Sequence, residues 1–314
     1  MNIIFMGTPD FARDSLEAIY NEGHNILAVV TNPDKPKGRG MKMIASPVKE
    51  FAIEHNLPVY QPVSVKNNTE FIEEMKALQP DLICVVAYGK ILPKEILEIP
   101  PYGCINVHAS LLPKYRGAAP IQWAILNGDT LTGVTTMYMD IGMDTGDIIL
   151  TKEVSIGEDE TTGELWDRLS KIGGELLSDT IKQIEEKTAP RIPQGNDFSM
   201  APMLSKDMAK IDWDTKTSTE IKNLVRGLNP IMGAYTMYQG KKIKLWKIEI
   251  VGDIQIDPNQ QPGQILIADD KQGLYIKTLD GAIKVLEIQG ENAKRMNVCD
   301  FLRGNRMEVN RILE

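Results

Sequence analysis

The chain has 314 residues, of which 42% are hydrophobic and 25% are charged. This is an ordinary globular composition, which excludes a collagen-like, coiled-coil or wholly disordered chain, and the length suits one large domain or two ordinary ones. There is no run of about 18 apolar residues and no basic residue before the first apolar segment, so we expect neither a membrane span nor a secretory signal. The odd number of widely spaced cysteines favours a reducing, cytoplasmic location over a disulfide framework.

The net charge of −8 is unevenly distributed. Residues 1–205 carry 18 basic and 28 acidic side chains, whereas residues 206–314 carry 17 and 15. Because binding to a polyanion depends on the local potential, an acidic protein can still bind nucleic acid through a basic loop or face. The two parts of the chain are therefore expected to face different partners.

Short apolar segments alternate with longer amphipathic ones through the first part of the chain. The apolar segments, each expected to form a strand, are residues 2–6, 26–32, 81–88, 104–109 and 133–139. The amphipathic segments, each expected to form a helix, are residues 9–21, 47–55, 118–127 and 161–187. This order predicts a Rossmann-like α/β domain in which helices cover both faces of a mostly parallel sheet.

The composition and the predicted elements of the chain change after residue 187. Residues 188–205 are rich in proline, glycine and polar side chains, which predicts a linker over the surface. After one helical segment, short strands are expected at residues 233–239, 242–251, 263–268, 273–278 and 282–289. Their close spacing predicts a small C-terminal β-barrel or sandwich, for which the open, five-stranded OB-like barrel is one candidate.

Two kinds of cofactor site are disfavoured. The first strand is followed by Gly7-Thr8-Pro9-Asp10, and a dinucleotide-binding turn needs a glycine where Pro9 stands so that the backbone can approach the pyrophosphate. We therefore expect an ordinary strand-to-helix turn and no nicotinamide or flavin dehydrogenase. The three histidines are scattered without ligand spacing, so no metal site is expected.

Two polar side chains stand at the end of one expected central strand. Asn106 and His108 share a face because strand side chains alternate, whereas central parallel strands are usually apolar on both faces. Ligands of open α/β sheets bind beyond the carboxyl ends of the strands, where a carboxamide can stabilise an oxyanion and an imidazole can carry a proton. Asp144, after another expected strand, is a candidate to pair with His108. The alternative is a buried histidine that merely bonds to its asparagine neighbour.

Residues 6–12, 106–117 and 144–147 together resemble the folate-dependent formyltransferases. Further matching segments, which extend the resemblance over nearly the whole chain, are residues 34–40, 46–49, 86–93, 210–213 and 229–230. The appended second domain and a basic loop most resemble the members that formylate methionyl initiator tRNA for translation initiation. The resemblance implies 10-formyltetrahydrofolate as formyl donor and the α-amine of the esterified methionine as acceptor, with no metal.

The resemblance also implies roles for individual residues. Asn106, His108 and Asp144 match the catalytic group, which stabilises a tetrahedral oxyanion and moves a proton. The positions that match folate-contacting segments are Ser110, Leu111, Leu112, Pro113, Tyr88, Gly89, Ile91 and Leu92. The positions that match a tRNA-contacting loop are Lys35, Lys37, Arg39 and Lys42. We expect a catalytic domain over residues 1–205, a tRNA-binding OB-like domain over residues 206–314, and a monomeric protein.

The chain departs from the family pattern at two places. Ala109 stands where a glycine is common, and residues 229–233 lack the usual Trp-Pro after Asn229-Pro230. An amino-sugar nucleotide formyltransferase is the nearest alternative, but it would not need the basic loop. Glycinamide ribonucleotide formyltransferase is complete without residues 206–314, and a noncatalytic nucleic-acid-binding protein would leave the paired polar side chains unexplained.

Overall fold

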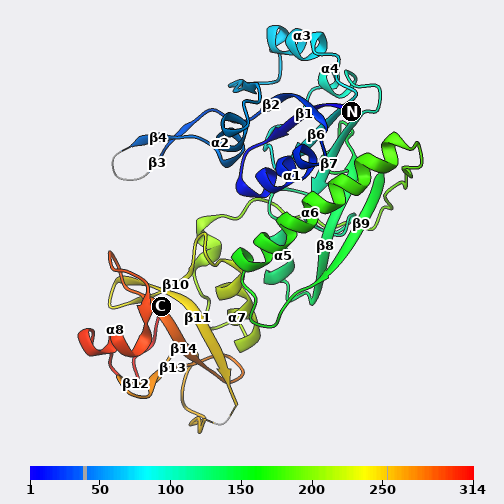
Figure 1. Cartoon of the computed structure of the whole chain (residues 1–314). Coiled ribbons are helices and arrows are strands. Elements are labelled where there is room, and N and C mark those ends of the chain that lie inside the picture. The colour runs from blue at the N-terminus through cyan, green and yellow to red at the C-terminus, as the bar shows by residue number, and fades with distance from the viewer. Residues whose placement is uncertain (38–40, 253) are drawn as a thin grey trace. The chain divides into compact units, whose positions relative to one another are not determined.

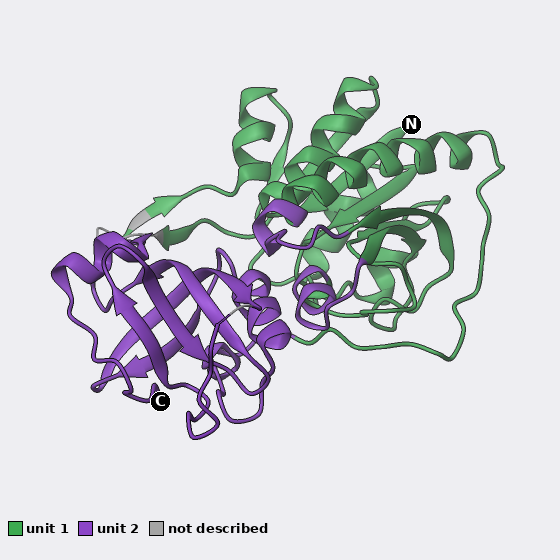
Figure 2. Ribbon diagram, turned by 90° about the horizontal axis from the view of Figure 1, so that it is seen from below, with its two compact units in different colours: residues 1–120, 131–155, 166–202 green, residues 121–130, 156–165, 203–314 purple. Residues whose placement is uncertain are grey.

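The computed structural model describes residues 1–37, 41–252 and 254–314. The chain divides into two compact units (Figure 2). Unit 1 consists of residues 1–120, 131–155 and 166–202, and unit 2 consists of residues 121–130, 156–165 and 203–314. Unit 2 therefore contains two short segments from within the region that the sequence pattern assigns to the first domain.

Unit 1 is built on a seven-stranded sheet with the strand order β5-β2-β1-β6-β7-β8-β9 (Figure 1). Its strands are β1 (Asn2–Gly7), β2 (Asn25–Val30), β5 (Val59–Tyr60), β6 (Leu82–Val86), β7 (Cys104–His108), β8 (Leu131–Tyr138) and β9 (Ile148–Ser155). Neighbouring strands from β5 to β7 pair in parallel, whereas β8 pairs antiparallel with both β7 and β9. The predicted mostly parallel α/β sheet is confirmed.

Helices lie on both faces of this sheet. Unit 1 contains α1 (Asp10–Asn21), α2 (Pro47–Glu54), α3 (Thr69–Ala77), α4 (Lys94–Leu97) and α6 (Thr162–Glu185) from residue 166 onward, whereas α5 (Pro120–Leu126) belongs to unit 2 from residue 121. Alternate strand residues such as Ile83 and Cys104 form one buried cluster with residues of α3 and α4. On the other face, Gly173 of α6 lies against Val107 of β7 and Phe11 of α1. No helix in the described residues is long and apolar enough to cross a membrane.

The predicted start of α2 is confirmed, whereas several other elements of unit 1 are not predicted from the sequence. Ser46 accepts a hydrogen bond from the main-chain nitrogen of Lys49 at 3.1 Å, and proline follows at the first helical position. The elements of unit 1 that the pattern does not predict are α3, α4, β5, β9 and the antiparallel pair β3 (Lys35–Lys37) and β4 (Lys42–Ile44). β9 is an edge strand that pairs with β8 in the sheet and exposes three consecutive residues, so it lacks the apolar run of a central strand.

Unit 2 contains a six-stranded antiparallel sheet in the order β10-β11-β14-β13-β12, with β15 beside β14. Its strands are β10 (Ala234–Tyr238), β11 (Lys241–Val251), β12 (Ile265–Asp269), β13 (Gly273–Lys277), β14 (Ala282–Gln289) and β15 (Met296–Asn297). α7 (Ser218–Gly227) starts with a capping box between Thr217 and Glu220, and α8 (Val298–Gly304) follows β15. One buried cluster joins Ile221 of α7, Phe301 of α8 and the inner side chains of the sheet. The expected β-rich second domain is thus confirmed.

The segment expected to be a linker is exposed, yet it is hydrogen-bonded to unit 1. Met200 forms a parallel bridge with Arg116, and Ile192 forms an antiparallel bridge with Ile148. The main-chain nitrogen of Arg116 donates to the carbonyl of Ser199 at 2.9 Å, and that of residue 201 donates back to the carbonyl of Arg116 at 2.7 Å. Residues 191–201, hereafter the strap, therefore hold the loops that follow β7 and β8.

Candidate active site

Asn106 and His108 lie at the carboxyl end of β7, between parallel β6 and antiparallel β8. They share the sheet face of Cys104, which packs toward α3 and α4. His108 is 6% exposed, whereas Asn106 is only half-buried. Two polar groups thus stand beside each other at the end of the strand where open α/β sheets bind ligands.

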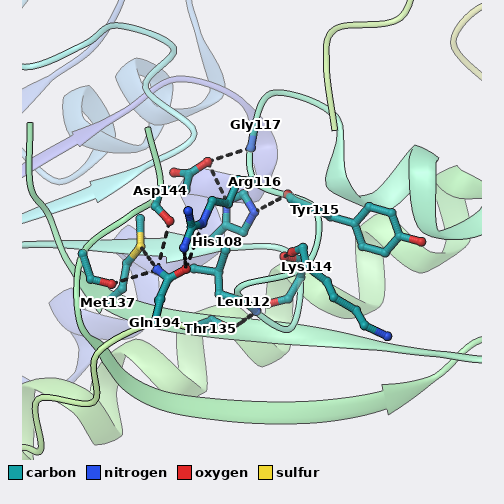
Figure 3. Close-up of polar contacts among 12 residues, drawn as sticks. His108, Leu112, Lys114, Tyr115, Arg116, Gly117, Thr135, Met137, Asp144 and Gln194 are labelled. Atoms are coloured by element: carbon teal, nitrogen blue, oxygen red, sulfur yellow. Dashed lines mark hydrogen bonds and ion pairs between the residues drawn. The ribbon is translucent and has the colours of Figure 1, made fainter. Parts of the chain in front are cut away.

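The two nitrogens of the His108 ring have different surroundings (Figure 3). Nε2 lies 2.9 Å from the main-chain oxygen of Tyr115, and because a carbonyl can only accept, we assign a hydrogen to Nε2. Nδ1 lies 3.7 Å from Oδ2 of Asp144, which also accepts the main-chain N–H of Gly117 at 2.8 Å. Nδ1 is therefore the ring nitrogen that faces the Asp144 carboxylate, while Nε2 is occupied by the Tyr115 carbonyl.

The turn after β7 is fixed by hydrogen bonds that leave few of its polar groups free. The Ser110 hydroxyl donates to the carbonyl of Lys114 at 2.6 Å. Thr135 of β8 donates to the carbonyl of Ser110 at 2.6 Å and accepts from the main-chain nitrogen of Leu112 at 3.1 Å. This turn brings the Tyr115 carbonyl back to the His108 ring. Ser110 and Leu112 are buried, while Leu111 and Pro113 are partly exposed.

The four expected folate contacts in the segment after β6 fall into two groups that differ in solvent exposure. Tyr88 and Leu92 are 2% and 4% exposed and belong to the core cluster beneath α3 and α4. Gly89 is exposed with a φ of 76°, and Ile91 is 76% exposed. Asn32, which the sequence pattern does not single out, donates to the carbonyl of Tyr88 at 2.9 Å. Asn32 lies shortly after β2, just as Asn106 lies near the end of β7. A polar residue at the end of an apolar strand is therefore the sequence signal by which Asn32 can be recognised.

Three of the expected tRNA-contacting residues, Lys35, Lys37 and Lys42, lie on the β3–β4 hairpin. Lys35 starts β3 with an exposed side chain, and the backbones of Lys37 and Lys42 pair across the two strands. Arg39 lies outside the described residues. Desolvation, and to a lesser degree the positive charge of Lys35, lowers the pKa of Lys90.

Two further residues of the site are Arg116, which lies in the matching segment 106–117 but has no role assigned from the sequence, and Gln194, which has no sequence signal. Gln194, in the strap, contacts both the Asp144 turn and the guanidinium of Arg116 (Figure 3). Arg116 is 8% exposed, and its guanidinium carbon lies 4.7 Å from the ring centroid of Phe198. Nothing in a Pro- and Gly-rich segment distinguishes a glutamine that bonds to a site from one that faces water. Across the described residues, no group of three His, Cys, Asp or Glu side chains is arranged to hold a metal ion.

Two family models match the chain. The formyl transferase model matches residues 1–181, and the model of the formyl transferase C-terminal domain matches residues 203–306. The chain belongs to the formyl transferase family. Among formyl transferases of known sequence, the methionyl-tRNA formyltransferase of Ruminiclostridium cellulolyticum is 50% identical over 310 residues, which cover 98% of both chains. That of Clostridioides difficile strain 630 is 52% identical over 314 residues, which cover 100% of both chains.

Solved structures share the formyl transferase fold at lower identity. The N-formyltransferase of Helicobacter canadensis, in complex with folinic acid and dTDP-3-aminofucose, has a TM-score of 0.68 and 22% identity, and the match covers 92% of this chain and 99% of that one. HypX from Aquifex aeolicus, in complex with tetrahydrofolic acid, has a TM-score of 0.66 and 16% identity, with 96% of this chain covered. This chain matches only 46% of the HypX chain, or about half of its length.

Proposed function

We propose that this formyl transferase moves the formyl group of 10-formyltetrahydrofolate to the α-amine of methionine esterified to initiator tRNA, for translation initiation. The observation that carries the proposal is the placement of Asn106, His108 and Asp144 at the carboxyl end of β7. Full-length relatives named methionyl-tRNA formyltransferase, at 50% and 52% identity, support this choice of acceptor. We place the folate donor at the same strand end, beside the partly exposed Leu111 and Pro113 and the exposed Ile91.

Asn106 and His108 act on the oxygen of the formyl group. The free amine attacks the formyl carbon, a carbon–nitrogen bond forms, and the carbonyl electrons move to the oxygen. The Asn106 carboxamide donates a hydrogen bond to this oxyanion, and His108 in its doubly protonated form adds positive charge beside it. Loss of one such donor typically slows a reaction roughly 10²–10³-fold.

His108 and Asp144 act on the proton. The attacking nitrogen loses a proton as the new bond forms, and N10 of the folate gains one as its bond to the formyl carbon breaks. His108 donates its Nδ1 proton to N10 and then regains a proton at the same atom from the nitrogen that has taken the formyl group, since Nε2 is held by the Tyr115 carbonyl. The products are formylmethionyl-tRNA and tetrahydrofolate, so the atoms balance without a covalent enzyme intermediate. General acid–base assistance of this kind contributes about 10²–10⁴ in rate.

We assign the remaining expected residues to substrate binding. The exposed parts of the turn after β7 and of the segment after β6 contact the folate, and Asn32 fixes the backbone of the latter. The cations of the β3–β4 hairpin attract the phosphates of the acceptor stem. Residues 206–314 form a tRNA-binding domain, for which lysines stacked on aromatic rings are suited, as Lys242 lies 3.9 Å from the ring centroid of Tyr235.

The alternative acceptor is an amino-sugar nucleotide, as in the ligand set of the Helicobacter canadensis structure. A decisive experiment supplies 10-formyltetrahydrofolate labelled in its formyl group together with either methionyl-tRNA or a dTDP-amino sugar. Label in the methionyl ester supports the proposed acceptor, and label in the sugar alone contradicts it. Because charged initiator tRNA is a substrate of the translation machinery, we also place the protein in the cytoplasm, and we propose that it acts as a monomer, which analytical ultracentrifugation tests.

A further inference from the structure

The side-chain amide of Gln194 uses all of its hydrogen-bonding capacity inside the candidate site. Its Oε1 accepts from Nε and Nη2 of Arg116 at 3.0 and 2.6 Å. Its Nε2 donates to the main-chain carbonyls of Asp144 and Gly146 at 2.9 and 2.8 Å. Because a guanidinium only donates and carbonyls only accept, this orientation of the amide is the one that satisfies every partner.

The two carbonyls that accept hydrogen bonds from Gln194 belong to the turn after β8, whose backbone conformation is unfavourable at Asp144. Asp144 has a φ of 53°, in the left-handed region that is uncommon for residues other than glycine. At Gly146, an added Cβ would lie 1.7 Å from the main-chain oxygen of Tyr138, so the turn is pressed against the end of β8. The two donated hydrogen bonds therefore help to keep Asp144 in a conformation that its own backbone does not favour.

The oxygen of the Gln194 amide is bound by Arg116, which is itself fixed in place. Arg116 is 8% exposed, its main chain pairs with the strap at Ser199 and Met200, and its guanidinium lies over Phe198. The next residue, Gly117, donates its N–H to Oδ2 of Asp144. Asp144 is thus held at two points. Its carboxylate accepts a hydrogen bond from the N–H of Gly117, and its main-chain carbonyl accepts one from Gln194.

We infer that Gln194 is a positioning residue that holds the Asp144 carboxylate opposite Nδ1 of His108. This inference rests on the proposed function, because it concerns the proton that His108 moves. Gln194 touches neither His108 nor the reacting atoms in this arrangement, and it acts through Asp144. A shift of about 1 Å in a catalytic group can lower a rate roughly 10²-fold, so loss of the two donated bonds has a kinetic consequence.

Two substitutions separate the donated bonds from the accepted ones. Gln194→Glu keeps the size of the side chain and its bonds to Arg116 but sets a carboxylate against the carbonyls of Asp144 and Gly146. Gln194→Met removes all four bonds at similar length. For both full-length variants we expect kcat to fall about 10–100-fold while KM for folate and for tRNA stays unchanged. Asn196→Ala, at an exposed position of the same strap, is the matched control and keeps wild-type kcat.

A double-mutant cycle with Asp144→Asn gives the readout that a merely structural role would not move. If Gln194 acts through Asp144, Gln194→Glu lowers kcat no further in the Asp144→Asn background. A full additional fall in that background overturns the inference, as does wild-type kcat of Gln194→Glu or failure of both variants to fold by circular dichroism. If the wild-type protein formylates no methionyl-tRNA, the proposed function fails instead, so the two failures are distinguishable.

Discussion

Nδ1 of His108 lies 3.7 Å from Oδ2 of Asp144, while the opposite ring nitrogen is 2.9 Å from the carbonyl of Tyr115. The first distance exceeds that of a direct hydrogen bond, and the second is a normal one. The ring is therefore anchored on one side and adjustable on the other. Such an arrangement suits a group that must take up and release a proton at one atom without changing its orientation.

His108→Ala removes the imidazole that we propose carries the proton. We expect kcat for formyl transfer to fall by about 10²–10⁴, because both the acid–base group and the charge beside the oxyanion are lost. Folate binding, followed by tryptophan fluorescence, is expected to persist. The melting temperature falls modestly because the buried Tyr115 carbonyl loses its donor. His55→Ala, which alters a histidine stacked on Phe51, is the control, and wild-type turnover by His108→Ala would rule out its assigned role.

Asp144→Asn removes the negative charge and keeps an oxygen for the N–H of Gly117. The substitution leaves the doubly protonated form of His108 without its charge partner, so we expect kcat to fall roughly 10²-fold with little change in either KM. Single-turnover measurement of formyl transfer isolates the chemical step from product release. A variant with normal single-turnover rate would show that the carboxylate has no part in proton transfer.

Lys35→Ala and Arg39→Ala test the basic hairpin. Each is expected to raise KM for methionyl-tRNA and to leave KM for folate unchanged, since phosphate contacts serve only the nucleic acid. For each phosphate contact that is lost, the slope of log affinity against log salt concentration becomes less steep by about 1. Lys76→Ala on α3, a lysine paired with Glu73 at the surface, is the control. Equal effects on both substrates would instead indicate that the hairpin supports the fold of the site.

Tyr88→Phe tests the burial of a hydroxyl that has no hydrogen-bond partner in the described residues. Desolvation raises the pKa of Tyr88 from 10 to about 12, so the folded state holds the neutral form more strongly than the unfolded state does. The contribution of this shift to the free energy of unfolding is fully present below pH 10. It is lost as the pH rises toward about 12, which lowers the free energy of unfolding by roughly 2–3 kcal/mol.

Urea unfolding of the Tyr88→Phe protein is expected to show equal or greater stability at pH 7.5, because an unpartnered buried hydroxyl is destabilising by about 1–3 kcal/mol. The variant is also expected to lose less stability than the wild type between pH 10 and 12. Tyr102→Phe, at an exposed tyrosine, is the control. If Tyr88→Phe is clearly less stable at pH 7.5, the hydroxyl has a partner that this arrangement does not contain.

The sheet of unit 1 follows from local signals in the sequence. Alternation of side chains in β7 places Asn106 and His108 on one face, and the alternation of apolar and amphipathic segments predicts that the sheet is mostly parallel. Edge strand β9 is different, because a strand with one neighbour and exposed charges has no continuous apolar run. Its existence depends on pairing with β8 rather than on its own composition.

The candidate site illustrates the same division. The sequence by itself determined the family, the alternating order of strands and helices, and the polar pair at the end of β7, because these depend on residue type and short-range periodicity. Only the tertiary structure decided that Asp144 comes within 3.7 Å of His108, that Tyr88 and Leu92 are part of the core, and that the strap carries Gln194 to the Asp144 turn. The hydrogen bond between Gln194 and Asp144 joins residues 50 positions apart, and a hydrogen bond across such a span leaves no periodic trace in the chain.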